Sequence, residues 1–141
     1  MQKLLMHISP VSDLKILKPL TFENGKNMLC ATDNLAFALM MFAKVDRKQH
    51  PQGNFHCSLK DDGVLYVDEK WENALREVFS GKKAYLYFIE KKGAVFNPDV
   101  PQFEFYNEMP VKKCIIINDI YVELQKKIES KLLKVNYYNS N

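Results

Sequence analysis

The amino-acid sequence predicts an α+β domain with mostly antiparallel strands. Short apolar or alternating runs recur along the chain and are separated by turn residues such as Asp61-Asp62-Gly63. Strands joined by such turns favour antiparallel pairing. Three segments, near residues 35–43, 69–79 and 119–133, instead carry apolar residues at helical spacing. We therefore expect about seven short strands and three helices around one core.

The first elements surround a connector that contains turn-forming residues. Residues 3–8 form an apolar run that Ser9-Pro10 closes, which is typical of a short strand. Residues 12–19 then form a connector leading to a turn at Asn24-Gly25, because glycine tolerates the backbone angles of tight turns. The apolar residues 27–31 predict the second strand.

A buried helix is expected next. Thr32-Asp33-Asn34 offers side-chain oxygens that can accept hydrogen bonds from the free N–H groups of a helix start. Residues 35–43 are apolar nearly all round, which predicts a largely buried helix. A polar loop over residues 46–53 leads to strands at residues 54–59 and 64–67, one on each side of the Asp-Asp-Gly turn.

The second half of the chain begins with a helix over residues 69–79, which Ser80-Gly81 ends. Residues 83–89 form the most aromatic of the predicted strands. Residues 97–101 contain two prolines and predict a loop, and residues 102–107 alternate as in a strand.

The last strand is expected at residues 111–117. Asp119 then caps an amphipathic helix that runs to about Leu133. We expect residues 1–134 to form a single domain and residues 135–141 to form a flexible tail.

Composition excludes several classes of protein. Hydrophobic residues make up 47% of the chain and charged residues 26%, which is typical of a packed domain rather than a disordered one. The net charge of +3 is too small to favour a nucleic-acid-binding protein. No run approaches the ~18 apolar residues of a membrane helix, and the three cysteines form no even disulfide set. These features predict a cytoplasmic protein with reduced thiols and no membrane contact.

Common catalytic motifs are missing from the sequence. It has no glycine-rich phosphate loop and no Cys-x-x-Cys pair. His50 and His56 lie across a Pro/Gly loop without regular ligand spacing, so we predict no metal site. Cys30, Cys57 and Cys114 lie in apolar strands and are expected to fill the core rather than act as nucleophiles.

Two candidate sites lie where a strand ends. His7 and Ser9 share one face of the first strand, because strand side chains alternate, and could clamp a ligand. A capping serine beside a surface histidine would give the same pattern. The strand over residues 29–33 runs directly into a helix start, a place suited to a polar or anionic ligand, although a plain helix cap is the alternative.

The third candidate is Glu108, which ends an aromatic strand just before a proline and shares a face with Tyr106. A carboxylate held beside apolar groups can stabilise a developing positive charge. An exposed glutamate at a strand end is the alternative.

Taken in order, these three places resemble the His, Tyr, Glu signature of the ADP-ribosyltransferases. Tyr106-Asn107-Glu108 is similar to the Y-N-E that carries the catalytic glutamate in poly(ADP-ribose) polymerases, and His7-Ile8-Ser9 resembles their H-G-S. The junction at residues 29–33 resembles their second strand and helix. The chain is also similar to small bacterial and phage domains that begin Y-H-G-S-P and carry a later Y-A-T strand-to-helix step.

The resemblance implies two small sheets that form a cleft in which NAD binds as a substrate. His7 would bind the adenosine ribose, Ser9 the nicotinamide amide, and the catalytic Glu108 the 2′-hydroxyl of the nicotinamide ribose. An unknown protein or small-molecule acceptor would then attack the ribose. The implied cofactor-binding set is completed by three further residues, Leu29, Thr32 and Tyr106.

The sequence departs from the family at two positions. Ile8 replaces the glycine after the histidine, and Leu29 or Cys30 stands where the second-strand tyrosine is expected. Phe37 would then be the ring that stacks on nicotinamide. Three functions follow: an NAD-dependent ADP-ribosyltransferase, an inactive module on the same fold that binds a nucleotide or a host protein, or a structural or assembly protein of a phage or mobile element.

Overall fold

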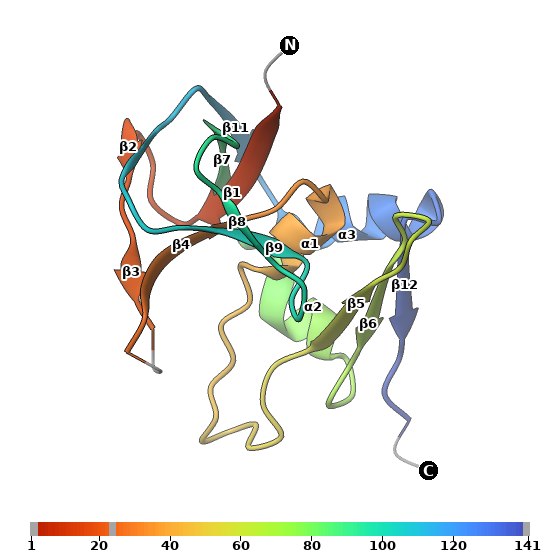
Figure 1. Ribbon diagram of the computed structural model, residues 1–141. Coiled ribbons are helices and arrows are strands. Elements are labelled where there is room, and N and C mark those ends of the chain that lie inside the picture. Colours follow the sequence, from red (N-terminus) through yellow and green to blue (C-terminus); the bar gives the residue numbers. More distant parts are fainter. Residues whose placement is uncertain (1–2, 23–24, 140–141) are drawn as a thin grey trace.

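The computed structural model describes residues 3–22 and 25–139. It confirms the predicted α+β class, with three helices and several small, mostly antiparallel sheets (Figure 1). The helices are α1 (Leu35–Met40), α2 (Ala74–Phe79) and α3 (Ile120–Glu129). The strands are β1 (Leu4–Ser9), β2 (Ile16–Leu17), β3 (Leu20–Thr21), β4 (Asn27–Ala31), β5 (His56–Leu59), β6 (Leu65–Asp68), β7 (Ala84–Glu90), β8 (Val95–Asn97), β9 (Gln102–Phe105), β10 (Met109–Pro110), β11 (Lys113–Ile117) and β12 (Leu133–Asn136).

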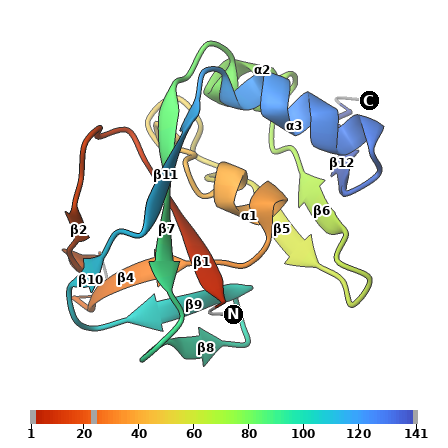
Figure 2. The same cartoon turned by 90° about the horizontal axis from the view of Figure 1, so that it is seen from above.

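These strands form four small sheets, where the resemblance implied two. One sheet has the order β1-β7-β11, and a second has the order β3-β4-β9-β8. A third, β12-β6-β5, pairs β12 parallel to β6, and β10 pairs with β2 in a two-stranded ribbon. Figure 2 shows β7 between β1 and β11, with β4, β9 and β8 on one side and α2 and α3 on the other.

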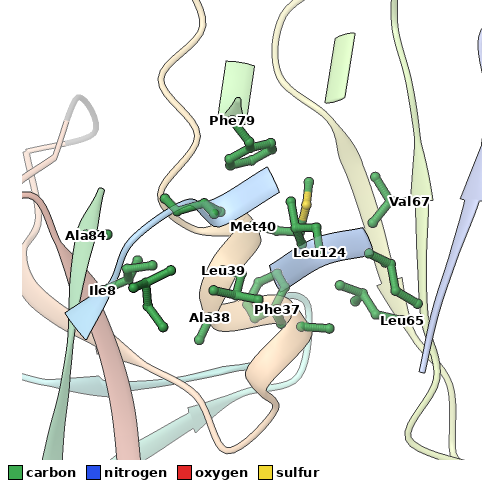
Figure 3. Packing of buried hydrophobic residues seen from close by; sticks show 14 of the residues in the cluster. Ile8, Phe37, Ala38, Leu39, Met40, Leu65, Val67, Phe79, Ala84 and Leu124 are labelled. Atoms are coloured by element: carbon green, nitrogen blue, oxygen red, sulfur yellow. The ribbon is translucent and has the colours of Figure 1, made fainter. Parts of the chain in front are cut away.

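The β1-β7-β11 sheet separates two hydrophobic cores. The larger core lies between this sheet and the three helices, where Leu39 of α1 and Leu124 of α3 are fully buried (Figure 3). The smaller core lies between the same sheet and the β4-β9 pair, and contains Leu5, Leu29 and Phe105. Alternation along β1 and β7 supplies both cores, because successive side chains point to opposite faces, whereas β11 contributes only Ile117, to the larger core.

The two larger antiparallel sheets meet at one backbone contact. The Met6 N–H donates to the Thr32 carbonyl at 2.8 Å, and the Thr32 N–H donates to the Met6 carbonyl at 2.9 Å. This bridge joins the middle of β1 to the end of β4. It therefore fixes the position of one sheet relative to the other.

Helix α1 begins as the sequence predicts. The Asn34 side chain accepts from the Phe37 N–H at 2.9 Å and caps the helix. The helix ends at Met40 rather than at residue 43. The Phe42 and Ala43 N–H groups bond to carbonyls three residues back, which tightens the last turn.

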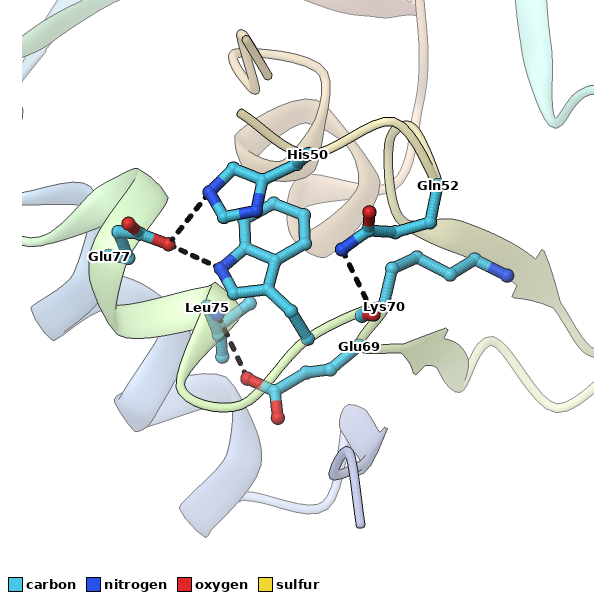
Figure 4. A network of polar contacts seen from close by, with 7 residues as sticks. His50, Gln52, Glu69, Lys70, Leu75 and Glu77 are labelled. Atoms are coloured by element: carbon cyan, nitrogen blue, oxygen red, sulfur yellow. Dashed lines mark hydrogen bonds and ion pairs between the residues drawn. The ribbon is translucent and has the colours of Figure 1, made fainter. Parts of the chain in front are cut away.

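Helix α2 starts later than predicted, at Ala74 rather than at residue 69. The buried carboxylate of Glu69 accepts from the Leu75 N–H at 2.9 Å, so it satisfies the helix start from outside the helix (Figure 4). Asn73 has a φ of 59°, a left-handed conformation that interrupts helical geometry.

The C-terminal prediction was also wrong in part. Helix α3 ends at Glu129, and Lys131, with a φ of 64°, turns the chain. Residues 133–136 then form β12 beside β6, so Val135 and Asn136 belong to a strand and not to a flexible tail. This strand forms because the backbone of β6 pairs with it, and such a distant pairing leaves no signal in the local sequence pattern. Asn24 of the predicted turn lies outside the described residues, and its neighbour Gly25 has a φ of 81°.

Replacing Leu124 with alanine should destabilise the fold by about 2–5 kcal/mol, because it leaves a cavity where α3 meets the larger core. Urea denaturation monitored by circular dichroism measures this change. Val122 lies on the same helix but is 46% exposed, so Val122→Ala should change the free energy of unfolding by less than about 0.5 kcal/mol. Equal losses for the two variants would contradict the packing described here.

Candidate functional site

A pocket of about 390 Å³ lies between β1 and the β3-β4 strands. It brings together two of the predicted site residues, His7 and Leu29. The surface beside these two residues is therefore concave, whereas a structural protein without a small-molecule site would be flat there. Its walls are mostly apolar, with Gln102 and His7 as the polar exceptions. The lining residues are His7, Ile8, Leu20, Phe22, Met28, Leu29, Cys30, Met41, Val100 and Gln102.

The His7 ring is fixed by one hydrogen bond. Its Nδ1 lies 2.7 Å from the carbonyl oxygen of Cys30, and a carbonyl can only accept, so Nδ1 must carry the proton. Burial lowers the pKa of His7, and the bond to Cys30 opposes this only in part. The ring is therefore neutral at pH 7, and Nε2 is an acceptor. A neutral acceptor in an apolar wall suits a hydroxyl or amide of a ligand.

A buried carboxylate lies next to this pocket. Glu104 stands opposite Cys30 in the β4-β9 pair and is 7% exposed. Its Oε2 accepts from Asn97 at 3.0 Å and from Gln102 at 3.2 Å, and its Oε1 accepts from the Tyr106 hydroxyl at 3.1 Å. The hydrogen bond from Asn97 has the largest effect on the pKa of Glu104 and lowers it. Burial raises this pKa, but the bonds from Gln102 and Tyr106 add to the lowering, so the net shift is downward. The carboxylate is thus ionised, and it orients the amide of Gln102 at the pocket wall.

Tyr106 and Glu108 of the Tyr-Asn-Glu motif do not line the pocket. Glu108 is exposed, in the bend between β9 and β10. Tyr106 is 52% exposed, and its hydroxyl is bound to Glu104. Neither residue lines the pocket that contains His7. The structure therefore brings His7 and Leu29 into one pocket but places Glu108 outside it.

The remaining predicted residues have local structural partners. The Ser9 Oγ accepts from the Val11 N–H at 3.1 Å, in the turn that follows β1. The Thr32 hydroxyl donates to the Pro101 carbonyl at 3.1 Å and accepts from the Asn34 N–H. Phe37 is buried in the larger core and borders a different pocket from His7. At the start of α1, the N–H groups of Asn34 and Phe37 are thus hydrogen-bonded to side chains of the protein itself.

The described residues contain neither a cluster of metal ligands nor an activated thiol. Within residues 3–22 and 25–139, no group of three or more His, Cys, Asp or Glu side chains could hold a metal ion. Burial, followed by a nearby carboxylate, raises the pKa of both Cys30 and Cys57 to about 11. Burial also raises the pKa of Cys114. The thiols are therefore protonated at neutral pH, which makes them poor nucleophiles.

A second polar cluster ties the loop before β5 to α2. The His50 ring stacks on Trp71 with centroids 3.7 Å apart, and its Nε2 lies 3.4 Å from the Glu77 carboxylate, which also accepts from the Trp71 indole (Figure 4). The Oε2 atom of Glu77 thus contacts both rings of the stacked pair. We assign the cluster to holding the loop over residues 46–53 in place.

Sequence reasoning missed Gln102 and Glu104. Their signal was present in the alternation of residues 102–105, where Phe103 and Phe105 enter the smaller core and the two polar side chains must therefore share the opposite face. The Tyr-Asn-Glu motif instead predicts a site at the strand end. Nothing in the sequence indicated that this face lies against His7.

Comparisons of the chain with protein-family models, curated proteins and solved structures found no match. Within the described part of the chain, no helix has both the length and the apolar character needed to cross a membrane.

The depressed pKa of His7 should make the fold less stable in mild acid. Above about pH 6.5, the usual histidine pKa, both folded and unfolded states hold His7 neutral. Below it the unfolded state binds a proton that the folded state does not, so the free energy of unfolding falls until the pH passes the folded pKa. Urea titrations between pH 8 and about pH 5 measure this fall, which should be smaller in His7→Gln. The same slope in both proteins would show that His7 is not held neutral.

Proposed function

We propose that the protein is an ADP-ribosyltransferase-like nucleotide-binding module, with NAD as its first candidate ligand, bound in the pocket beside His7. The observation that supports this most directly is the neutral His7 ring, fixed by the Cys30 carbonyl, with Nε2 as an acceptor in an apolar wall. A ribose hydroxyl can donate to such a nitrogen. The proposal keeps the role that the sequence resemblance implies for His7.

The size and chemistry of the pocket agree with part of a nucleotide. Its volume of about 390 Å³ lies within the roughly 300–1,000 Å³ of small-molecule sites. Phe22 and Met28 offer apolar surface for a flat ring, and Gln102 offers an amide whose orientation Glu104 fixes. The lining residues carry no formal charge while His7 is neutral. We therefore expect the pocket to hold a nucleoside half of NAD and the pyrophosphate to face solvent.

Binding without transfer is favoured by the place of Glu108. Stabilising an oxocarbenium-like transition state requires a carboxylate aimed at the reacting ribose. Glu108 is exposed and does not line the pocket. The replacement of the family tyrosine by Leu29 or Cys30 also removes a ring that would orient nicotinamide for cleavage.

Binding is tested by the melting temperature of the protein with NAD, nicotinamide or adenosine. NAD should raise the melting temperature, because a ligand that binds only the folded state stabilises it. Phe22→Ser should weaken NAD binding about tenfold, since it removes apolar contact from the pocket. Phe96 is a matched control, because it is 54% exposed on the same sheet but lies outside this pocket. Phe96→Ser should bind NAD as the natural chain does, and no melting shift with any of the three compounds would contradict the proposal.

A second candidate is the NAD-dependent ADP-ribosyltransferase itself, transferring ADP-ribose to a protein or small-molecule acceptor. The specific observation in its favour is the ionised Glu104, because its partner Gln102 lines the pocket. In this candidate the buried carboxylate of Glu104 would stabilise positive charge on the bound ribose, and Glu108 would bind the 2′-hydroxyl of the nicotinamide ribose, as the resemblance implies.

The transferase predicts release of nicotinamide from NAD by the purified protein, which chromatography of the products detects. Glu108→Gln should abolish the release if Glu108 is catalytic, because a neutral amide cannot stabilise the charge. Glu129→Gln, an exposed change at the end of α3, should leave it unchanged. Binding of NAD without nicotinamide release would exclude the transferase and leave the binding module.

A further inference from the structure

The outer edge of the β1-β7-β11 sheet is open. Strand β11 is the last in the order, and among the described residues no strand pairs with its outer side. All residues from Lys113 to Ile116 are exposed, including the apolar Ile115 at 38% and Ile116 at 54%. An edge strand presents unpaired backbone N–H and C=O groups that can template a further strand. The exposed apolar side chains favour binding of a further strand, whereas an edge strand with only charged side chains would disfavour it.

A groove of about 360 Å³, here called the β11 groove, runs beside this edge. The connector between β1 and β2 forms its other wall, and Tyr85 and Ile116 contribute to its apolar floor. The connector is held in place by Tyr87, whose hydroxyl donates to the Val11 carbonyl and accepts from the Leu14 N–H. The groove is therefore a formed feature of the fold and lies outside the pocket that contains His7.

The rim of the β11 groove is basic. Lys15, Lys112 and Lys113 border it, against the single acidic residue Asp13. The Lys112 ammonium lies 3.3 Å from the Glu90 carboxylate, and the Lys113 ammonium lies 5.2 Å from the centroid of the Phe88 ring, so contacts with β7 hold both side chains. The groove therefore combines an open backbone edge, an apolar floor and a positive rim.

We propose that β11 and its groove bind an extended, acidic segment of a partner protein by strand addition. The backbone of that segment pairs with the outer edge of β11, and alternate side chains then point to the same face. Apolar side chains on one face occupy the groove floor beside Ile116. Acidic side chains lie against the lysine rim, where complementary charge speeds association and sets specificity.

Charge also argues against a second copy of this chain as the occupant. Antiparallel pairing of two β11 strands would bring two sets of groove lysines to one interface. Like charges across a strand pair are destabilising. An acidic partner instead gains from the same lysines. The proposal does not depend on NAD binding, because the β11 groove and the His7 pocket have no lining residue in common.

The test is a selection of random peptides from a display library on the immobilised full-length protein. The selected peptides should alternate acidic and apolar residues. One of them, synthesised and labelled, should bind in solution more weakly as salt is raised. Its addition should shift backbone amide resonances of residues 113–117 in nuclear magnetic resonance spectra.

Two variants locate the binding. The double change Lys15→Glu with Lys113→Glu should weaken binding of the peptide about tenfold or more, because it reverses the rim charge. Lys134→Glu, an exposed charge reversal on β12, should leave it unchanged. Ile116→Lys alters the groove floor at a side chain that is 54% exposed, so it should remove binding while the melting temperature stays close to that of the natural chain.

The proposal fails if the selected peptides show no acidic enrichment, or if their binding survives both groove variants. It also fails if the resonance shifts fall outside β11 and its groove. Sedimentation of the free protein gives an independent check. A dimer that Ile116→Lys dissociates would show that a second copy of this chain covers the edge.

Discussion

Strand β7 is buried on both faces, and this constraint organises the whole molecule. Leu86 points into the core shared with the helices, whereas Tyr87 and Ile89 point into the core shared with β4 and β9. An apolar strand of this kind must be covered on each side, so helices collect on one face and a second sheet on the other. Its aromatic residues also reach the connectors, because the Tyr87 hydroxyl holds the chain that leaves β1.

The candidate site is a consequence of how the two sheets meet. The Met6–Thr32 bridge joins β1 to the end of β4, and it sets the Cys30 carbonyl beside the His7 ring. That single acceptor fixes the tautomer of the ring, and burial keeps it neutral. The pocket therefore forms where the two sheets meet, and its walls are apolar because the strands that line it carry mostly apolar side chains.

Much of the fold could be predicted from periodicity, whereas the site could be predicted only in part. The run at residues 27–31 matched β4, and the Asn34 cap was found because capping is a local property. His7 and Leu29 do share a pocket. Glu104 was missed because its role depends on pairing with β4, and a pairing over some seventy positions leaves no local pattern in either strand.

The sequence by itself determined the class of the fold, the place of most strands and the start of α1, since these follow from side-chain alternation and from bonds within a few residues. Tertiary structure alone decided the rest. Glu69 delays the start of α2 from outside the helix, and β6 draws residues 133–136 into a strand where local pattern favoured a helix and a tail. It also decided which polar side chains face one another, because desolvation and hydrogen bonding between distant strands exist only after the sheets have packed.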